Sequence, residues 1–412
     1  MDFIKILRAR RLIDGTGGAP IDYPMVVVKN GRIIDVGTEG DVDLPRGEPV
    51  EELSFMEGTI LPGLIDSHLH IALGTRGGYD EMMLDSNGIH LMTGVINAGE
   101  ALAAGITTVK EAGARDTVTM DLREGWRRGL IDAPRLLVSG RPLTVPEGHF
   151  HFCNDNTARG VEEVRSRVRQ FVEEDVDVIK IMASGGGTTG TRNSEASFTE
   201  KELRAAVDEA HSLGMTTMAH CEAYASVGNA ARAGVDVLEH CGFILPDGSR
   251  GFDEEAAGLM AEKGLYYNPT LQTGSQRRDA LQEKIQQGEH LTGDEERSLE
   301  RFDYKIKRKS ENLLRMAELG VQVVAGSDGI GLGNSTQVIR TVELMVDAGL
   351  TPMQAIVSAT GNGAKALRMG HIFGTIKRGL EADIIAVQGD PSEDIASLRS
   401  PLMVMQGGRV VY

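Results

Sequence analysis

The chain has 412 residues, and its 60 acidic and 43 basic residues give a formal net charge of −17 at pH 7. This balance provides no basic stripe, so nucleic acid and an anionic membrane are excluded as expected partners. No apolar stretch approaches the roughly 18 residues needed to cross a bilayer, and the three cysteines, Cys153, Cys221 and Cys241, form no Cys-x-x-Cys pair. That cysteine usage fits a reducing compartment.

The two ends of the chain share one character. Residues 1–58 alternate short apolar runs with turns, and Asn30-Gly31 is a strong hairpin signal. Residues 383–387 and 403–412 are also short and apolar. We therefore expect the two ends to meet in one small β-sandwich. In the first 14 residues, charges are scattered among apolar residues, so the continuous hydrophobic region of a signal peptide is lacking. This pattern predicts a cytoplasmic protein.

The region between the ends alternates strand and helix patterns, which predicts parallel strands joined by right-handed crossovers. Helix signals separate the strands, as in the capping box Thr199-Glu-Lys-Glu202. The eight expected strands cover residues 60–67, 106–111, 135–139, 176–182, 215–220, 235–240, 265–270 and 321–326. The fold class is thus α/β, a (β/α)8 TIM barrel over residues 59–365 between sandwich segments 1–58 and 366–412. A bare barrel needs about 250 residues, so this length leaves room for the second module.

Possible metal ligands stand at the C-terminal ends of several expected strands. In a barrel these ends meet on one face, so side chains from different strands converge there. Residues two apart on an extended segment point to the same side, which lets a His-x-His pair bind one ion. Imidazole and carboxylate both suit zinc. The candidate ligands are His68, His70, Lys180, His220, His240 and Asp328.

Lys180 lies inside the apolar run Val178-Ile-Lys-Ile-Met182. A buried ammonium is costly unless it is neutralised or paired. One interpretation is a lysine that reaches a carboxylate at the strand end. The interpretation that we favour is a neutral amine that has added carbon dioxide, because the resulting carbamate, N6-carboxylysine, can bridge two cations about 3.5–4 Å apart.

Two further segments allow more than one interpretation. Residues 273–308 are polar and charged, which is typical of a solvated helical hairpin, and the alternative is a lid over the barrel mouth. Gly185-Gly-Gly-Thr-Thr-Gly190 formally matches a dinucleotide fingerprint, but no helix signal follows before Thr199. We expect an active-site loop there.

Taken together, these residues resemble the amidohydrolase superfamily, in the imidazolonepropionase-related branch with binuclear sites that includes Xaa-Pro and Xaa-Arg dipeptidases (prolidases). The resemblance extends over nearly the whole chain. The matching stretches are 58–70, 105–109, 179–186, 202–214, 219–221, 233–240, 326–328 and 374–387.

The resemblance implies a role for each candidate ligand. His68, His70 and Asp328 would hold the more buried metal, His220 and His240 the more exposed one, and carbamylated Lys180 would bridge them. The cofactors would be two divalent ions, with zinc expected, although manganese and cobalt accept the same ligands. His149 matches the family's Gly-Gly-His position, and His149, His151 and Tyr224 are candidates for contacting substrate and stabilising an oxyanion. We also expect a homo-oligomer, although the sequence does not fix the oligomeric state.

The expected activity is hydrolysis of an amide C–N bond in a dipeptide or N-acyl amino acid-like small molecule. A metal-bound hydroxide would attack, with Asp328 as general base and acid. Alternatives are another small amide or carbamate, a xenobiotic included, a lactone or phosphotriester, and a non-catalytic scaffold of the same fold. A deaminase fits less well, because Glu222 follows His220 by two residues where related deaminases place a glutamate at three.

Overall fold

Two parallel sheets form the centre of the computed structural model, which describes residues 4–44, 47–74, 79–82 and 84–412. The first sheet has the order β13-β12-β11-β10-β9 and the second β14-β6-β7-β8, and every pairing in them is parallel. The strands are β6 (Leu64–His70), β7 (Ile106–Glu111), β8 (Arg135–Val138), β9 (Val178–Met182), β10 (Thr216–His220), β11 (Val237–Glu239), β12 (Tyr266–Asn268), β13 (Gln322–Val323) and β14 (Gly329–Ile330). The mixed α/β class predicted from the sequence is confirmed.

Backbone hydrogen bonds connect the two parallel sheets at both of their margins. Next to β8 and β9, Asp177 N donates to Val138 O at 2.7 Å. Near β6 and β13, Ser67 N donates to Ala325 O at 2.9 Å. All five residues of β9 are buried, as expected for a parallel strand whose two faces are both covered.

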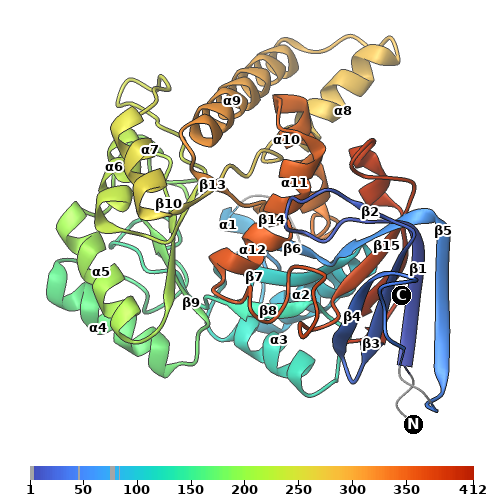
Figure 1. Ribbon diagram of the computed structural model, residues 1–412. Helices are drawn as coiled ribbons and strands as arrows, with labels where there is room; N and C mark the ends of the chain where they lie inside the picture. Colours follow the sequence, from blue (N-terminus) through green and yellow to red (C-terminus); the bar gives the residue numbers. More distant parts are fainter. Residues whose placement is uncertain (1–3, 45–46, 75–78, 83) are drawn as a thin grey trace.

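Helices surround these sheets (Figure 1). Thr199 caps α5 as predicted: its side chain accepts from Glu202 N, and the Glu202 carboxylate accepts from Thr199 N. The helices are α1 (Tyr79–Met82), α2 (Asn87–Ala103), α3 (Val118–Arg127), α4 (Val161–Glu173), α5 (Glu200–Ser212), α6 (Tyr224–Ala233), α7 (Glu254–Lys263), α8 (Ser275–Gln286), α9 (Gly293–Glu318), α10 (Gln337–Ala348), α11 (Pro352–Ser358), α12 (Gly361–Ala366) and the 3-10 helix η1 (Ile395–Arg399). None of the helices in the described part of the chain is long and apolar enough to cross a membrane.

The N- and C-terminal segments meet in one mixed sheet of eight strands, seen beside both termini in Figure 1. Its spatial order is β17-β16-β15-β5-β1-β3-β4, with β2 paired to β1. The strands are β1 (Ile4–Leu12), β2 (Ile21–Asp22), β3 (Pro24–Lys29), β4 (Arg32–Thr38), β5 (Val50–Pro62), β15 (Ile384–Gln388), β16 (Pro401–Gln406) and β17 (Arg409–Val410). Asn30 and Gly31 form the predicted two-residue turn, with φ of 50° and 78°. Residues 1–3 of the predicted N-terminal segment lie outside the described residues.

The strand expected over residues 60–67 is in fact two strands that belong to different sheets. Residues up to Pro62 in β5 pair with β15, whereas β6 begins at Leu64 in the parallel sheet. The break falls at Gly63, where an added Cβ would lie 2.1 Å from Thr107 Oγ1. Only glycine permits this close approach. β5 therefore leads directly from the mixed sheet into the strand that carries His68 and His70.

Candidate metal centre

Three candidate ligands meet where β6 and β14 lie side by side. The ligand atoms of His68, His70 and Asp328 all lie within 4.8 Å of one another. Asp328 Oδ1 is 3.3 Å from His68 Nε2 and 3.4 Å from His70 Nε2. Asp328 N donates to His68 O at 2.6 Å, and Asp66 Oδ1 accepts from the backbone N of both His68 and Ser327 at 3.0 Å. These bonds hold Asp328 against the His-x-His segment.

The other histidine candidates continue this cluster. The His68 and His240 rings are 5.2 Å apart between centroids, and His240 and His220 are 4.7 Å apart. His240 and Asp328 have positive φ values of 67° and 54°, a conformation that histidine and aspartate adopt more readily than most residues and that concentrates at functional sites. One cavity of about 190 Å³ contains all six candidates. It is lined by His68, His70, His149, Lys180, Met182, Gly186, Gly187, Asn193, His220, Glu222, His240, Thr273, Lys305 and Asp328.

Each histidine of the cluster has one ring nitrogen in contact with a polar oxygen. His68 Nδ1 lies 2.8 Å from Glu239 Oε2, and His70 Nδ1 lies 2.8 Å from Gly113 O. His220 Nε2 lies 3.0 Å from Gly185 O, and His240 Nδ1 lies 2.7 Å from Thr270 Oγ1. A carboxylate or carbonyl can only accept, so the contacts of His68, His70 and His220 place the proton on the bonded nitrogen and leave the other one unprotonated. This is the tautomer that a metal ligand requires. The Thr270 hydroxyl can donate or accept, so its contact does not fix the tautomer of His240.

Burial also favours neutral imidazoles. It lowers the pKa of His220 to about 4, and it lowers the pKa of His70 and of His240. Burial acts to raise the pKa of Asp328, but the neighbouring His68 and His70 outweigh it and hold that pKa well below its ordinary value. The set therefore consists of neutral nitrogen donors and one carboxylate, which is the donor chemistry that divalent transition metals prefer.

Lys180 lies on β9 and is 1% exposed. Within the described part of the chain its Nζ has no hydrogen-bond partner, and neither has His68 Nε2. Burial lowers the pKa of Lys180 to about 8, against the raising effect of Glu239 and Asp328. Buried polar atoms are normally satisfied. These orphaned atoms, facing a cavity of donors, fit a site built for cations.

Glu239 was not among the residues that the sequence indicated. It is fully buried on β11, one residue before His240, and its carboxylate contacts both His68 Nδ1 and, at 3.3 Å, Lys110 Nζ. Burial acts to raise the pKa of Glu239, but His68 and Lys110 outweigh it and bring the pKa to about 2. The signal that could have identified Glu239 is an acidic residue within an apolar strand, directly before the predicted ligand His240. In the sequence, we considered the cost of a buried charge only for Lys180.

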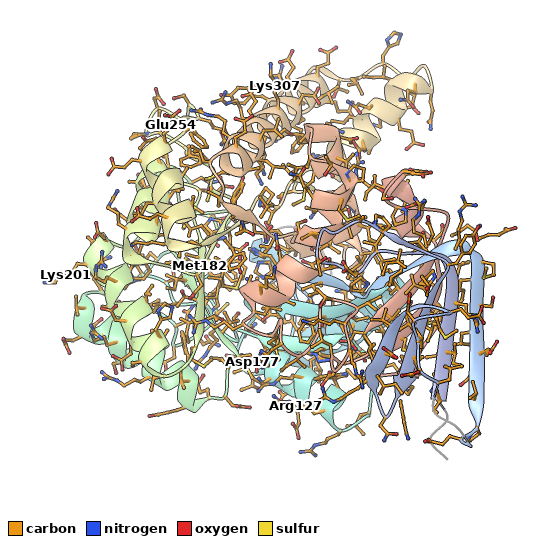
Figure 2. All side chains as sticks on the ribbon, viewed as in Figure 1. Arg127, Asp177, Met182, Lys201, Glu254 and Lys307 are labelled. Carbon is orange, nitrogen blue, oxygen red and sulfur yellow. The ribbon has the colours of Figure 1, made fainter. Side chains whose placement is uncertain are left out.

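We expect Glu239→Gln to weaken metal binding, since it removes the charge that orients His68 and completes the pairing of Lys110. Residues in this supporting role typically account for about 10- to 100-fold in metal affinity or activity. Competition with a chromophoric chelator would measure the change. Glu254→Gln on α7, labelled in Figure 2, removes an exposed carboxylate and is the matched control. Equal affinities for the two variants would contradict a supporting role for Glu239.

The three predicted substrate contacts lie in different places. His149 is buried in the cavity, with its ring 4.8 Å from that of His220 and its Nδ1 2.7 Å from Thr188 Oγ1. An added Cβ on Gly186 would lie 2.3 Å from the His149 ring, so the glycine-rich loop packs directly on it. His151 bonds to Gly148 O through Nδ1, and Tyr224 packs on Phe243. Neither His151 nor Tyr224 belongs to the cavity lining.

The charged segment 273–308 contributes to the same cavity. It contains all of α8 and the first part of α9, so the segment is helical as expected. Thr273 and Lys305 from this segment line the cavity, and so do Asn193 from the loop after β9 and Met182, labelled in Figure 2. The loop from Gly185 to Gly190 does not open into a helix, because α5 begins only at Glu200.

Comparison with known proteins agrees with this architecture. The model of the amidohydrolase family matches residues 59–411, so the chain belongs to that family. The sequence is 27% identical to ochratoxinase from Aspergillus niger, over 99% of this chain and 86% of the relative. It is 25% identical to imidazolonepropionase from Anaeromyxobacter dehalogenans, over 94% of this chain and 90% of the relative.

Among solved structures, a prolidase complexed with N-methylphosphonate-L-proline superimposes with a TM-score of 0.83 at 28% identity, covering 99% of each chain. The resemblance to the amidohydrolase superfamily is thereby confirmed, and the protein is a hydrolytic enzyme. Members of this family typically use metal ions, and His68, His70 and Asp328 form a possible metal-binding group.

Proposed function

We propose that this protein is a binuclear metal-dependent hydrolase that cleaves an amide C–N bond in a dipeptide or an N-acyl amino acid-like molecule. The observation that carries the proposal is that one cavity collects His68, His70, Lys180, His220, His240 and Asp328. The likeness to a prolidase complexed with N-methylphosphonate-L-proline supports the substrate class.

His68, His70 and Asp328 would hold one divalent ion and His220 and His240 a second, with zinc as the expected metal. Lys180 would join the two sites as N6-carboxylysine: its neutral amine forms an N–C bond to carbon dioxide and releases a proton. Burial supports this step, since the lowered pKa of Lys180 increases the fraction of neutral amine. When bound, the two cations would lower the pKa of water and polarise a substrate carbonyl.

The side chains of the protein would manage the proton and the oxyanion. Asp328 is held between His68 and His70 and stays ionised, so it can accept a proton from water and pass it to the departing amine. An amide nitrogen leaves poorly unless it is protonated, which makes this transfer essential. His149 lies against His220 at the cavity wall, where a ring N–H can stabilise a developing oxyanion. His151 and Tyr224 remain candidates for contacting the part of the substrate outside the cavity.

The same proposal includes the arrangement of the domains. We propose that the two parallel sheets close into one (β/α)8 barrel over residues 59–365, because hydrogen bonds join both margins of the sheets. Segments 1–58 and 366–412 would form the β-sandwich beside it. A cytoplasmic location and a homo-oligomeric state remain predictions.

Turnover of a substrate panel tests the proposed reaction. The metal-loaded protein is incubated with dipeptides and N-acetyl amino acids, and with carbamates, lactones and phosphotriesters as rival classes. We expect release of free amine from the amides, detected by an amine-reactive fluorophore. Turnover confined to a rival class would contradict amide hydrolysis while leaving the site intact. No turnover of any class would favour a non-catalytic scaffold.

A further inference from the structure

One cationic side chain of α9 lines the cavity of the candidate ligands. Lys305 is partly buried there and lines the same 190 Å³ cavity as His68 and Asp328. It belongs to the segment between β12 and β13, which comes after the strands that carry the histidines. Lys305 is thus the lysine of this cavity that does not lie on a barrel strand.

The packing of α9 fixes the position of Lys305. Lys309 lies four residues further on, hence on the same face of α9, and is 2% exposed. Its Nζ donates to Thr270 O at 3.1 Å and to Thr270 Oγ1 at 3.2 Å. Leu313 and Met316 continue the buried face. Because Thr270 also contacts His240, this face of α9 is tied directly to the site.

Glu222 and Asp328, acidic side chains of the cavity lining, are paired with residues other than Lys305. The nearby carboxylate Glu222 faces Arg250, whose Nη1 lies 3.6 Å from Glu222 Oε2. Among the residues that the structure describes, none forms an ion pair with Lys305 within 4.0 Å.

We propose that Lys305 determines specificity by binding a free carboxylate of the substrate. This inference rests on the proposed function and deepens it: the substrate is the subclass of dipeptides and N-acyl amino acids whose terminal carboxylate is unblocked. Lys305 and the His-x-His pair line one cavity, so a substrate with its amide at the ligands and its carboxylate at Lys305 would lie within a single enclosed space. Partial burial strengthens this pairing, because screening by water is reduced.

Calorimetric titration of the metal-loaded, full-length protein tests the assignment. The probes are N-methylphosphonyl-L-proline and its carboxamide, which differ only in the charge at the carboxyl end. The variants are Lys305→Met and Lys305→Arg. The control is Lys307→Met on the same helix, which removes an exposed lysine labelled in Figure 2 and outside the cavity lining. Methionine and arginine have helix propensities close to that of lysine, so α9 is preserved.

We expect wild type and Lys307→Met to bind the carboxylate probe about 10- to 100-fold more tightly than the carboxamide, as is typical of a charge-assisted hydrogen bond. Lys305→Met should lose this preference by weakening only carboxylate binding, and Lys305→Arg should retain part of it. Unchanged preference in Lys305→Met would overturn the assignment. A wild type that binds neither probe, or both equally, would also overturn it.

Failure of the Lys305 assignment can be distinguished from failure of the proposed amide hydrolysis. Amide turnover on the panel with a preference that does not depend on Lys305 would remove only this inference. A Lys305-dependent preference for the carboxylate probe, together with no amide turnover, would remove the proposed reaction and keep the carboxylate site.

Discussion

Replacement of Lys180 by alanine is expected to lower kcat/KM by on the order of 10³-fold, since metal assistance is worth several kcal/mol of transition-state stabilisation. The variant removes the one side chain that can join both groups of ligands. Lys180 is buried, and its Nζ has no hydrogen-bond partner among the residues that the structure describes, so truncation removes no hydrogen bond of that part of the chain. Steady-state kinetics on the best amide of the panel measures the effect.

The exposed Lys201 on α5, at the outer edge in Figure 2, provides the matched control, and Lys201→Ala should retain wild-type kinetics. Added acetate or propionate should partly restore the Lys180→Ala variant, because a small carboxylate can occupy the vacated position. Wild-type activity of Lys180→Ala would exclude a bridging role for this residue.

Asp328→Asn is expected to reduce kcat by about 10²- to 10⁴-fold, the usual contribution of a general acid or base. Asparagine keeps the shape of the side chain beside His68 and His70 but cannot accept the proton. The loss should be largest for amides and smaller for the corresponding esters, because an alkoxide leaves more readily than an unprotonated amine. Parallel kinetics on an amide and ester pair measures this difference.

Asp347→Asn removes an exposed carboxylate of α10 and serves as the control for the charge change. Equal losses for amide and ester in Asp328→Asn would indicate that Asp328 acts only as a ligand. No loss for either would contradict its place in the mechanism.

The candidate ligands could be identified from the sequence because of a general property of parallel sheets. Strand-end positions such as His68, His220 and Asp328 are far apart in the chain, but parallel strands bring their C-terminal ends to one face. The apolar runs around them located the strands, and the residue types indicated the chemistry. Periodicity and residue type were therefore sufficient to predict that the six candidate ligands share a cavity.

Other features depend on contacts that spacing does not encode. The pairing of Glu239 with His68 and Lys110 requires the side-chain geometry across three strands. The place of Lys305 in the cavity lining depends on how α9 packs, and the polar sequence of this segment does not predict that packing. The break between β5 and β6 at Gly63 depends on the close contact with Thr107, which no local sequence pattern reveals.

Metal content per chain, measured by elemental analysis of wild type and Lys180→Ala purified in parallel, tests the binuclear centre most directly. We expect about two divalent ions in wild type, as in a two-metal hydrolytic site, and fewer in the variant. One ion or none in wild type, with no change on removing Lys180, would contradict the bridged centre and the mechanism built on it.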